Sequence, residues 1–107
     1  MIIAKYTIEK NKHTLVVAGH SRYAEYGKDI VCAGVSALVQ ALIGWVDDSY
    51  CKVECISKDE INNEVIVSCC GGKDVKAAFS MAYIGLEQIA ESYPNHLQID
   101  KDIGLAY

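Results

Sequence analysis

The spacing of apolar residues changes along this chain, and that change restricts the fold more than any other feature. From Ile2 to Ile8, apolar side chains alternate as in a strand with one buried face. Thr14 to Ala18 is rich in residues that favour strands, and the polar turn from Glu9 to Lys12 predicts a hairpin between the two segments. Tyr50 to Ser57 and Glu64 to Cys70 also alternate. Four strands are therefore predicted, in two sequential pairs.

Two longer segments repeat their apolar residues every three or four positions, which indicates helices. We expect the first helix to begin after Asp29, a favourable N-cap, and to end near Trp45 or Asp47. Asp74 is the expected N-cap of the second helix, which Pro94 stops. The apolar positions are Val31, Val35, Leu38, Val39, Leu42 and Val46 in the first helix, and Val75, Ala78, Phe79, Ala82, Leu86, Ile89 and Tyr93 in the second.

The predicted order is β-β-α-β-β-α, with a short last strand from His96 to Asp100 as a possible addition. This order predicts an α+β fold in two layers, a mixed or antiparallel sheet of four or five strands with two helices. The chain has 107 residues, 51% of them hydrophobic, so we expect residues 1–107 to form a single domain. The larger aromatic residues are expected in the core or in dimer contacts: Trp45, Phe79, Tyr83 and Tyr93.

Charge and the N-terminal residues restrict the environment. The net charge is −4 without a lysine or arginine cluster, which argues against a surface for nucleic acid or for an anionic membrane. Met1 to Tyr6 alternates like a strand and lacks the pattern of a secretory signal, so a cytoplasmic protein is expected. Ile30 to Val46 is mostly apolar, but Gln40 interrupts it and Asp29 and Asp47 flank it. We interpret it as a core helix rather than a membrane span.

The chain has five cysteines, an odd number without a secretory signal, so reduced thiols are expected. The spacing of Cys51 and Cys55, with the adjacent pair Cys69 and Cys70, does not match a usual zinc site. Consecutive strand residues also point to opposite faces of a sheet. These four thiols are therefore predicted to be packing residues, and we expect neither a metal nor a cofactor.

Cys32 lies in a different setting. It is the third residue of the predicted first helix, where the helix dipole and free N–H groups favour a thiolate. His20 follows the predicted second strand, with eleven residues between it and Cys32, in a loop that runs from Gly19 to Lys28 and has glycines at positions 19 and 27. We therefore regard Cys32 as a candidate nucleophile and His20 as a candidate general base.

Two neighbouring residues have alternative roles. Asp29 is either a helix cap alone or also a group that orients His20. Ser36, one turn after Cys32, either contacts the thiol or the substrate, or bonds back to its own helix. The other two histidines, His13 and His96, are expected at the surface.

The segment from Gly19 to Leu38, GHSRYAEYGKDIVCAGVSAL, resembles the signature of the ribosomal-processing cysteine protease family, Prp. The resemblance rests on the G-H pair, the G-x-D triplet and the run D-I-V-C-A-x-V-S-A-L at the spacing of the family. Chain length and element order agree over nearly the whole chain. Two positions depart from the pattern: Ser21 stands where alanine is usual, and Gly34 where alanine is common.

The resemblance implies a cysteine endopeptidase that removes the N-terminal extension of ribosomal protein twenty-seven of the large subunit, cutting after a phenylalanine pair. Cys32 matches the nucleophile of the family and His20 its base, and Asp29 and Ser36 match its aspartate and serine. The resemblance also implies a homodimer. In the expected reaction His20 takes the proton of Cys32, the thiolate attacks the scissile carbonyl, and N–H groups at the helix start hold the oxyanion.

Five residues in the loop are candidates for contact with the substrate. We expect Gly27 to act as a hinge of a loop that closes over the peptide, with Tyr23 and Tyr26 as walls for aromatic residues. The full set of candidates is Gly19, Ser21, Tyr23, Tyr26 and Gly27.

Two other functional classes use the same features. A thiol redox or peroxide sensor would use a reactive Cys32 with a second cysteine that resolves it. A non-catalytic ribosome-assembly factor would bind the extended ribosomal protein and release it uncut. Cleavage of a peptide without an oxidant separates the protease from both.

Overall fold

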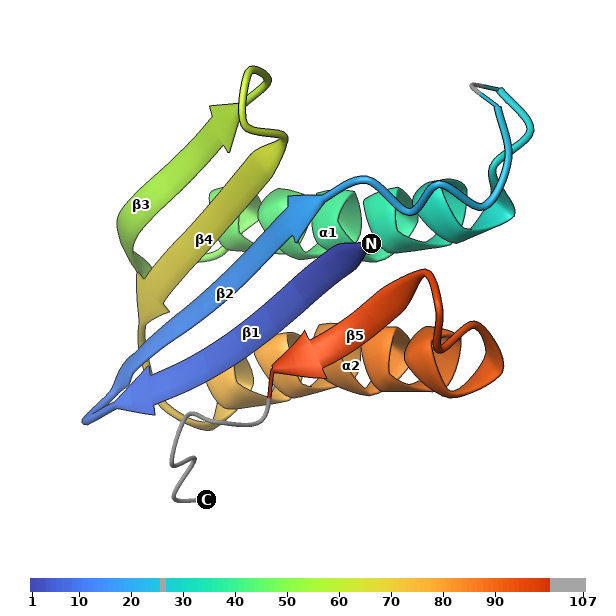
Figure 1. The fold of residues 1–107 in the computed structure, drawn as a ribbon. Helices are drawn as coiled ribbons and strands as arrows, with labels where there is room; N and C mark the ends of the chain where they lie inside the picture. The colour runs from blue at the N-terminus through green and yellow to red at the C-terminus, as the bar shows by residue number, and fades with distance from the viewer. Residues whose placement is uncertain (26, 101–107) are drawn as a thin grey trace.

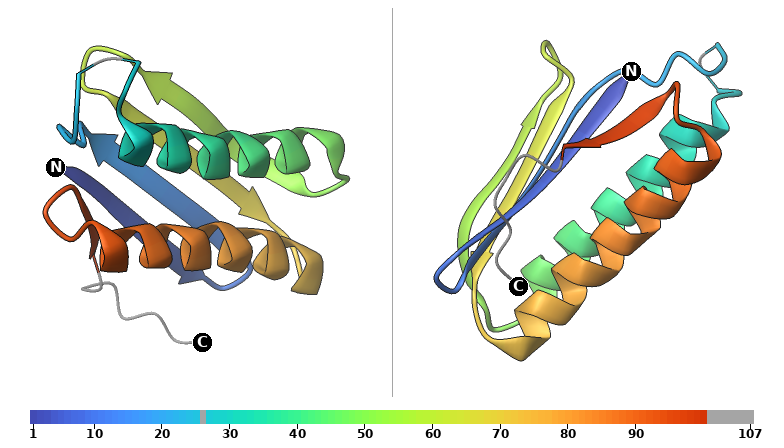
Figure 2. Two further views of the ribbon diagram at one scale, coloured as in Figure 1. Left: turned by 90° about the vertical axis from the view of Figure 1, so that its right-hand side faces the viewer. Right: turned by 60° about the horizontal axis from the view of Figure 1, so that its bottom comes forward.

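Five strands form one mixed sheet, and both helices lie on the same face of it (Figures 1 and 2). The computed structural model describes residues 1–25 and 27–100. The strand order is β3-β4-β2-β1-β5; β5 runs parallel to β1, and the other neighbours are antiparallel. This confirms the predicted α+β fold, including the short last strand. The elements are β1 (Ile2–Glu9), β2 (Lys12–Gly19), α1 (Ile30–Asp48), β3 (Lys52–Asp59), β4 (Glu64–Cys70), α2 (Lys73–Ser92) and β5 (Leu97–Asp100).

The core lies between the helices and the sheet. Side chains from α1 and α2 pack on the alternate residues of β1, β2 and β4 that face them. Tyr6 and Phe79 are among the largest fully buried side chains, and Tyr83 is also buried. Trp45 and Tyr93 are partly buried against the same cluster. The predicted core positions of the aromatic residues are confirmed.

The apolar character of α1 is explained by this packing. By length and composition α1 is apolar enough to cross a membrane. In the structure one side of α1 instead faces the core, with five buried residues: Val31, Val35, Val39, Leu42 and Val46. This is the amphipathic stripe expected of a core helix in a two-layer fold.

Two glycines let α1 and α2 approach closely. The helices lie side by side and run in opposite directions (Figure 2). A Cβ atom added at Gly85 would lie 2.7 Å from Cδ2 of Leu38, and one added at Gly34 would lie 3.1 Å from Cδ1 of Ile89. Gly34 has no side chain at the point where Ile89 of α2 packs on α1, and a larger residue would crowd this contact.

The alternation from Tyr50 to Ser57 predicts Cys51, Val53 and Cys55 on one face of the strand, and this prediction is wrong for Cys55. A bulge between Val53 and Cys55 shifts the register, so that Val53 lies opposite Cys69 and Cys55 lies opposite Ser68. Val53 and Cys55 therefore occupy different faces of the sheet, although their spacing predicts one face. All five cysteines are free thiols: Cys69 is buried, Cys32 is exposed, and the other three are partly buried.

The predicted cap of the second helix is also wrong. α2 begins at Lys73, and its N-cap is Gly72, which has no side-chain hydrogen bond to the helix. Asp74 lies inside the first turn, where Oδ1 accepts a hydrogen bond from the N–H of Val75 at 2.9 Å. A carboxylate in that turn still interacts favourably with the helix dipole.

The surface position predicted for His13 is wrong as well. His13 pairs with Ile8 and with Cys69 in the sheet, on the side that faces the helices. Its side chain is 4% exposed, and its Nδ1 lies 2.6 Å from the hydroxyl of Tyr6. Burial lowers the pKa of His13, and the nearby charge of Lys76 lowers it further.

We expect the free energy of unfolding to decrease in mild acid because His13 is buried in its neutral form. The unfolded chain binds this proton with the ordinary pKa near 6.5, and the folded chain binds it less readily. The contribution of neutral His13 to the free energy of unfolding is therefore complete above about pH 6.5. It is lost as the pH falls from there through the lowered pKa of His13 in the folded state. Urea unfolding at about pH 7.5 and about pH 5.5 measures the loss. His13→Gln, which does not titrate, should lose less, and an equal loss in both proteins would contradict this assignment.

Candidate active site

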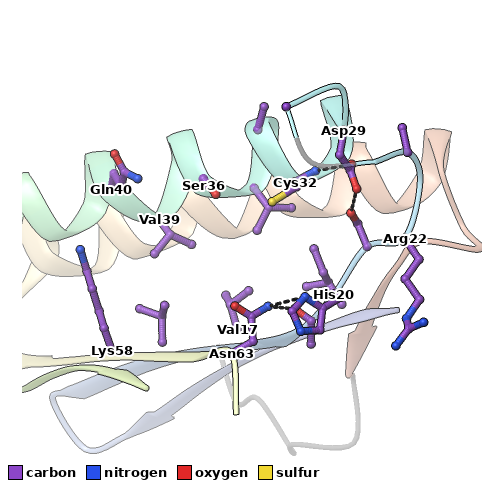
Figure 3. A pocket seen from close by; sticks show the side chains of 18 residues that line it. Val17, His20, Arg22, Asp29, Cys32, Ser36, Val39, Gln40, Lys58 and Asn63 are labelled. Atoms are coloured by element: carbon purple, nitrogen blue, oxygen red, sulfur yellow. Dashed lines mark hydrogen bonds between the residues drawn. The ribbon is translucent and has the colours of Figure 1, made fainter. Parts of the chain in front are cut away.

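A pocket of about 860 Å³ opens between α1 and the sheet (Figure 3). The end of β2 and the following loop form one wall, α1 forms a second, and the hairpin of β3 and β4 forms a third. Both Cys32 and His20 line this pocket, from α1 and from the residue after β2. The two residues selected from sequence therefore face one common space.

Cys32 occupies the predicted place at the start of α1. The helix begins at Ile30, and Asp29 is its N-cap, with extended backbone angles. Oδ1 of Asp29 accepts a hydrogen bond from the N–H of Cys32 at 2.9 Å. The cap prediction is confirmed, and the exposed thiol lies at the positive end of the helix dipole.

The carboxylate of Asp29 also binds the loop that precedes α1. Its Oδ2 accepts hydrogen bonds from the hydroxyl of Ser21 and, at 3.3 Å, from the N–H of Tyr23. Burial by itself would raise the pKa of Asp29, but hydrogen bonds from Cys32, Ser21, Ala24 and Tyr23 outweigh it and hold the pKa below its ordinary value. The ionised carboxylate thus links the loop to the helix.

The same contacts restrict the predicted oxyanion donors. The N–H of Cys32 donates to the Asp29 side chain, and the N–H of Ala33 donates to the Asp29 carbonyl at 3.0 Å. Either group would have to leave Asp29 to hold an oxyanion. A role for N–H groups at the helix start stays a prediction.

His20 is exposed at the rim of the pocket, where its ring contacts the β3–β4 hairpin. Nδ1 of His20 lies 3.4 Å from Nδ2 of Asn63. Among residues 1–25 and 27–100, no hydrogen bond joins Asp29 to His20. The structure therefore places Asp29 as a cap and loop anchor, and its role in orienting His20 stays a prediction.

Ser36 and Gln40 continue the pocket wall from Cys32 along α1 (Figure 3). The spacing of four residues puts the three side chains on one side of the helix. Ser36 is half-buried at the wall. Its position allows contact with a bound peptide, and this role stays a prediction.

The other predicted substrate contacts divide into two groups. Gly19, Ser21 and Gly27 line the pocket. Tyr23 instead packs edge-on against the rings of Tyr93 and His96, with ring centroids 5.3 Å apart in both pairs. Tyr26 lies outside the described residues.

Glycine is required at the point where β2 enters the loop. Gly19 has φ of +104°, which other residues rarely adopt. A Cβ atom there would also collide with the carbonyl oxygen of Met1. Gly27, the predicted hinge, has φ of +88°.

The structure adds residues that sequence reasoning missed. Asn63 and Lys58 from the β3–β4 hairpin, and Arg22 from the loop, line the pocket. His96 donates from Nδ1 to the carbonyl of Ser21 at 2.8 Å and is half-buried, so its predicted surface position is wrong. No local pattern points to Lys58, Asn63 or His96, because sheet pairing alone brings the hairpin and the residue before β5 to the loop. Arg22 lies in the loop itself.

Valine and isoleucine side chains from the sheet and from α1 give the pocket apolar walls. Such walls suit an apolar or aromatic side chain of a peptide, while the exposed thiol and imidazole lie at the edge. These valine and isoleucine residues are Ile2, Val17, Val35, Val39 and Val65. Among residues 1–25 and 27–100, no group of three His, Cys, Asp or Glu side chains is placed to hold a metal ion.

Comparisons with known proteins agree with this chemistry. A family model described as cysteine protease Prp matches residues 1–98. The ribosomal processing cysteine protease Prp of Mycoplasma genitalium is 33% identical over 95 residues, which cover 89% of this chain and 94% of the relative. The protein of the same description from Mycoplasma pneumoniae is 26% identical over 89 residues, which cover 82% and 86%.

Solved structures share the fold. The essential ribosomal processing protease Prp from S. aureus, in complex with a covalently linked product peptide, has a TM-score of 0.83 and 22% identity, covering 94% of this chain and 98% of that one. The same protease with a substrate peptide has a TM-score of 0.76 and 21% identity, with the same coverage. The family model and the relative at 33% identity decide the assignment. This chain belongs to the family of ribosomal processing cysteine proteases Prp.

Proposed function

We propose that this protease removes the N-terminal extension of ribosomal protein twenty-seven of the large subunit, cutting after an aromatic pair. One observation carries the proposal: Cys32, at a capped helix start, and His20 line the same apolar-walled pocket. The related S. aureus structures hold a substrate peptide and a covalently linked product peptide, which supports peptide chemistry in this fold. A ribosomal protein is made in the cytoplasm, so we place the activity there.

The proposed reaction is acyl transfer in two steps. His20 takes the proton from Sγ of Cys32, and Sγ bonds to the scissile carbonyl carbon. The imidazolium returns that proton to the leaving amine as the C–N bond breaks, which leaves a thioester on Cys32. His20 then takes a proton from water, and the hydroxide oxygen bonds to the acyl carbon. The C–S bond breaks, and the imidazolium gives its proton to Sγ, which restores the thiol and the neutral base.

The shape of the pocket supports the aromatic preference. Apolar side chains from α1 and β4, including Val39 and Val65, form walls on which an aromatic ring can pack. The roles of Tyr23 and Tyr26 as further walls, and of Gly27 as a hinge for loop closure, remain part of the proposal.

We expect wild-type protein to cut a peptide that contains the phenylalanine-pair site, and Cys32→Ala to lose about a thousandfold or more of that activity because the nucleophile is gone. His20→Ala should be similarly impaired. Cys55→Ala, which removes a thiol outside the pocket, is the matched control and should keep its activity. Mass spectrometry of the products measures the cut, and full cleavage by Cys32→Ala would exclude the proposal.

The same experiment tests the two alternatives. The described cysteines other than Cys32 do not line the pocket, so a resolving thiol for a peroxide sensor is not beside Cys32 in this structure. A disulfide formed with peroxide, together with no cleavage, would favour the sensor. Tight binding of the extended ribosomal protein, with no change in its mass, would favour an assembly factor.

We expect Asp29→Ala to destabilise the protein by about 1 kcal/mol, because the variant loses the cap of α1. It should also cut more slowly, since the loop that carries Ser21 and Tyr23 is released. Asp29→Asn keeps an oxygen acceptor for the N–H of Cys32 and should retain most of the stability. Asp74→Ala, in the first turn of α2 but not at its N-cap, is the control. Equal melting temperatures for Asp29→Ala and Asp74→Ala would contradict the assignment.

We further propose a homodimer, which the family resemblance implies. Exposed apolar side chains on α2 support it: Met81 is 73% exposed and Ile84 is 51% exposed, one helical turn apart. Sedimentation velocity should give the mass of a dimer for the wild type and that of a monomer for the double variant Met81→Glu, Ile84→Glu. A monomeric wild-type protein at micromolar concentration would exclude this proposal.

A further inference from the structure

Asn63 lies beside the candidate base, although the two residues are 43 positions apart in the sequence. It is in the turn between β3 and β4, with φ of +49°. Asparagine adopts this left-handed conformation more readily than most residues other than glycine. Because β4 pairs with β2 in antiparallel register, with Glu64 opposite Ala18, the turn lies against the end of β2.

Asn63 holds both peptide groups that flank Gly19. Its carbonyl accepts a hydrogen bond from the N–H of Gly19 at 3.0 Å, and its side-chain Nδ2 donates to the carbonyl of Gly19. The backbone of Gly19 also lies close against the carbonyl of Met1, with no room for a Cβ atom. Gly19 is therefore enclosed from two sides, and this sets the backbone position from which His20 extends.

The side-chain amide of Asn63 also reaches the ring of His20. Its orientation follows from the contact with Gly19, since a carbonyl accepts only from the NH₂ end of an amide. The same NH₂ group lies 3.4 Å from Nδ1 of His20, so Nδ1 is the acceptor and the neutral ring carries its proton on Nε2. An imidazolium would place an N–H donor against this NH₂ donor.

We propose that Asn63 is a positioning residue for His20. It holds the neutral imidazole at the rim of the pocket through Nδ1, the basic nitrogen of this tautomer, and gives up that hydrogen bond when Nδ1 takes the proton of Cys32 and the imidazolium forms. The inference rests on the proposed function, in which His20 is the base. Asn63 satisfies two demands at once, a left-handed backbone and a side-chain donor. Glycine satisfies only the first, and aspartate replaces the donor with an acceptor.

Other charges around His20 stay constant when position 63 is changed. Among residues 1–25 and 27–100, the charged and titratable groups that line the pocket with His20 are Arg22, Asp29, Cys32 and Lys58. The carboxylate of Asp29 accepts its hydrogen bonds from the loop and from the N–H of Cys32. A change in the pH profile of a variant at position 63 therefore reports on its contact with His20.

The test uses two variants and a neighbouring control. Asn63→Gly allows the left-handed backbone of the turn and removes the side-chain amide. Asn63→Asp keeps a side chain of the same size and presents a carboxylate to Nδ1 of His20. Asn62→Gly is the control, because the side chain of Asn62 donates to Asp59 at 2.7 Å and does not line the pocket. The measurements are kcat and KM on the aromatic-pair peptide between about pH 5 and about pH 10, with the melting temperature of each protein.

We expect Asn63→Gly to lower kcat about tenfold with KM within about twofold, because a loosely held base loses orientation rather than peptide binding. Asn63→Asp should move the acidic limb of kcat/KM upward by about one pH unit, since a carboxylate beside Nδ1 stabilises the imidazolium and His20 acts as the base only when it is neutral. Asn62→Gly should keep the wild-type kcat and pH profile. Equal kcat for Asn63→Gly and Asn62→Gly, or an unshifted limb in Asn63→Asp, would overturn the proposal.

A readout without cleavage separates this inference from the proposed function. Nitrogen-15 NMR of the histidine rings reports which nitrogen carries the proton. In the wild type we expect the neutral His20 ring to carry its proton on Nε2. In Asn63→Asp we expect the neutral ring to carry its proton on Nδ1, which then faces the carboxylate. An Nδ1–H tautomer in the wild type would overturn the positioning role whether or not the peptide is cut. Failure of cleavage together with the expected tautomers would exclude only the proposed function.

Discussion

The carboxylate of Asp29 is the interaction on which the site depends. Its two oxygens bind groups that would otherwise be independent: the N–H of Cys32 in α1, and the hydroxyl of Ser21 with the N–H of Tyr23 in the loop. The hydrogen bonds keep the pKa of Asp29 low, so that the anion persists where the positive end of the helix dipole favours it. The start of the helix and the loop that follows His20 are therefore held as one unit.

The one-sided packing of the sheet provides the other half of the site. Both helices cover the same face, and α2 packs closely on α1 through Gly34 and Gly85. Along the opposite side of α1, Cys32, Ser36 and Gln40 are too small or too polar to fill the space over the β2–β4 part of the sheet, and the pocket forms there. The same strand order brings the β3–β4 turn, with Asn63, to the end of β2.

The spacing of apolar residues predicted the two helices and four strands. Each element buries one face, so its apolar residues recur with the period of a helix or of a strand. The predictions that failed concern single positions. A bulge moved Cys55 to the other face, Gly72 rather than Asp74 is the N-cap of α2, and His13 is buried because its strand register points it at the helices. None of these follows from local spacing, since a bulge, a cap and a register are each decided by what packs on the element.

Sequence alone determined the local half of the site. Asp29 and Cys32 are three residues apart, and the cap that joins them depends only on the start of one helix. The tertiary structure alone decided the rest. Asn63 reaches His20 across 43 positions, and His96 reaches Ser21 across 75. Such contacts depend on which strands pair and in what register, and the pattern of one segment does not contain that information. For this reason the nucleophile and its cap could be found in the sequence, and the groups that hold the histidine and its loop could not.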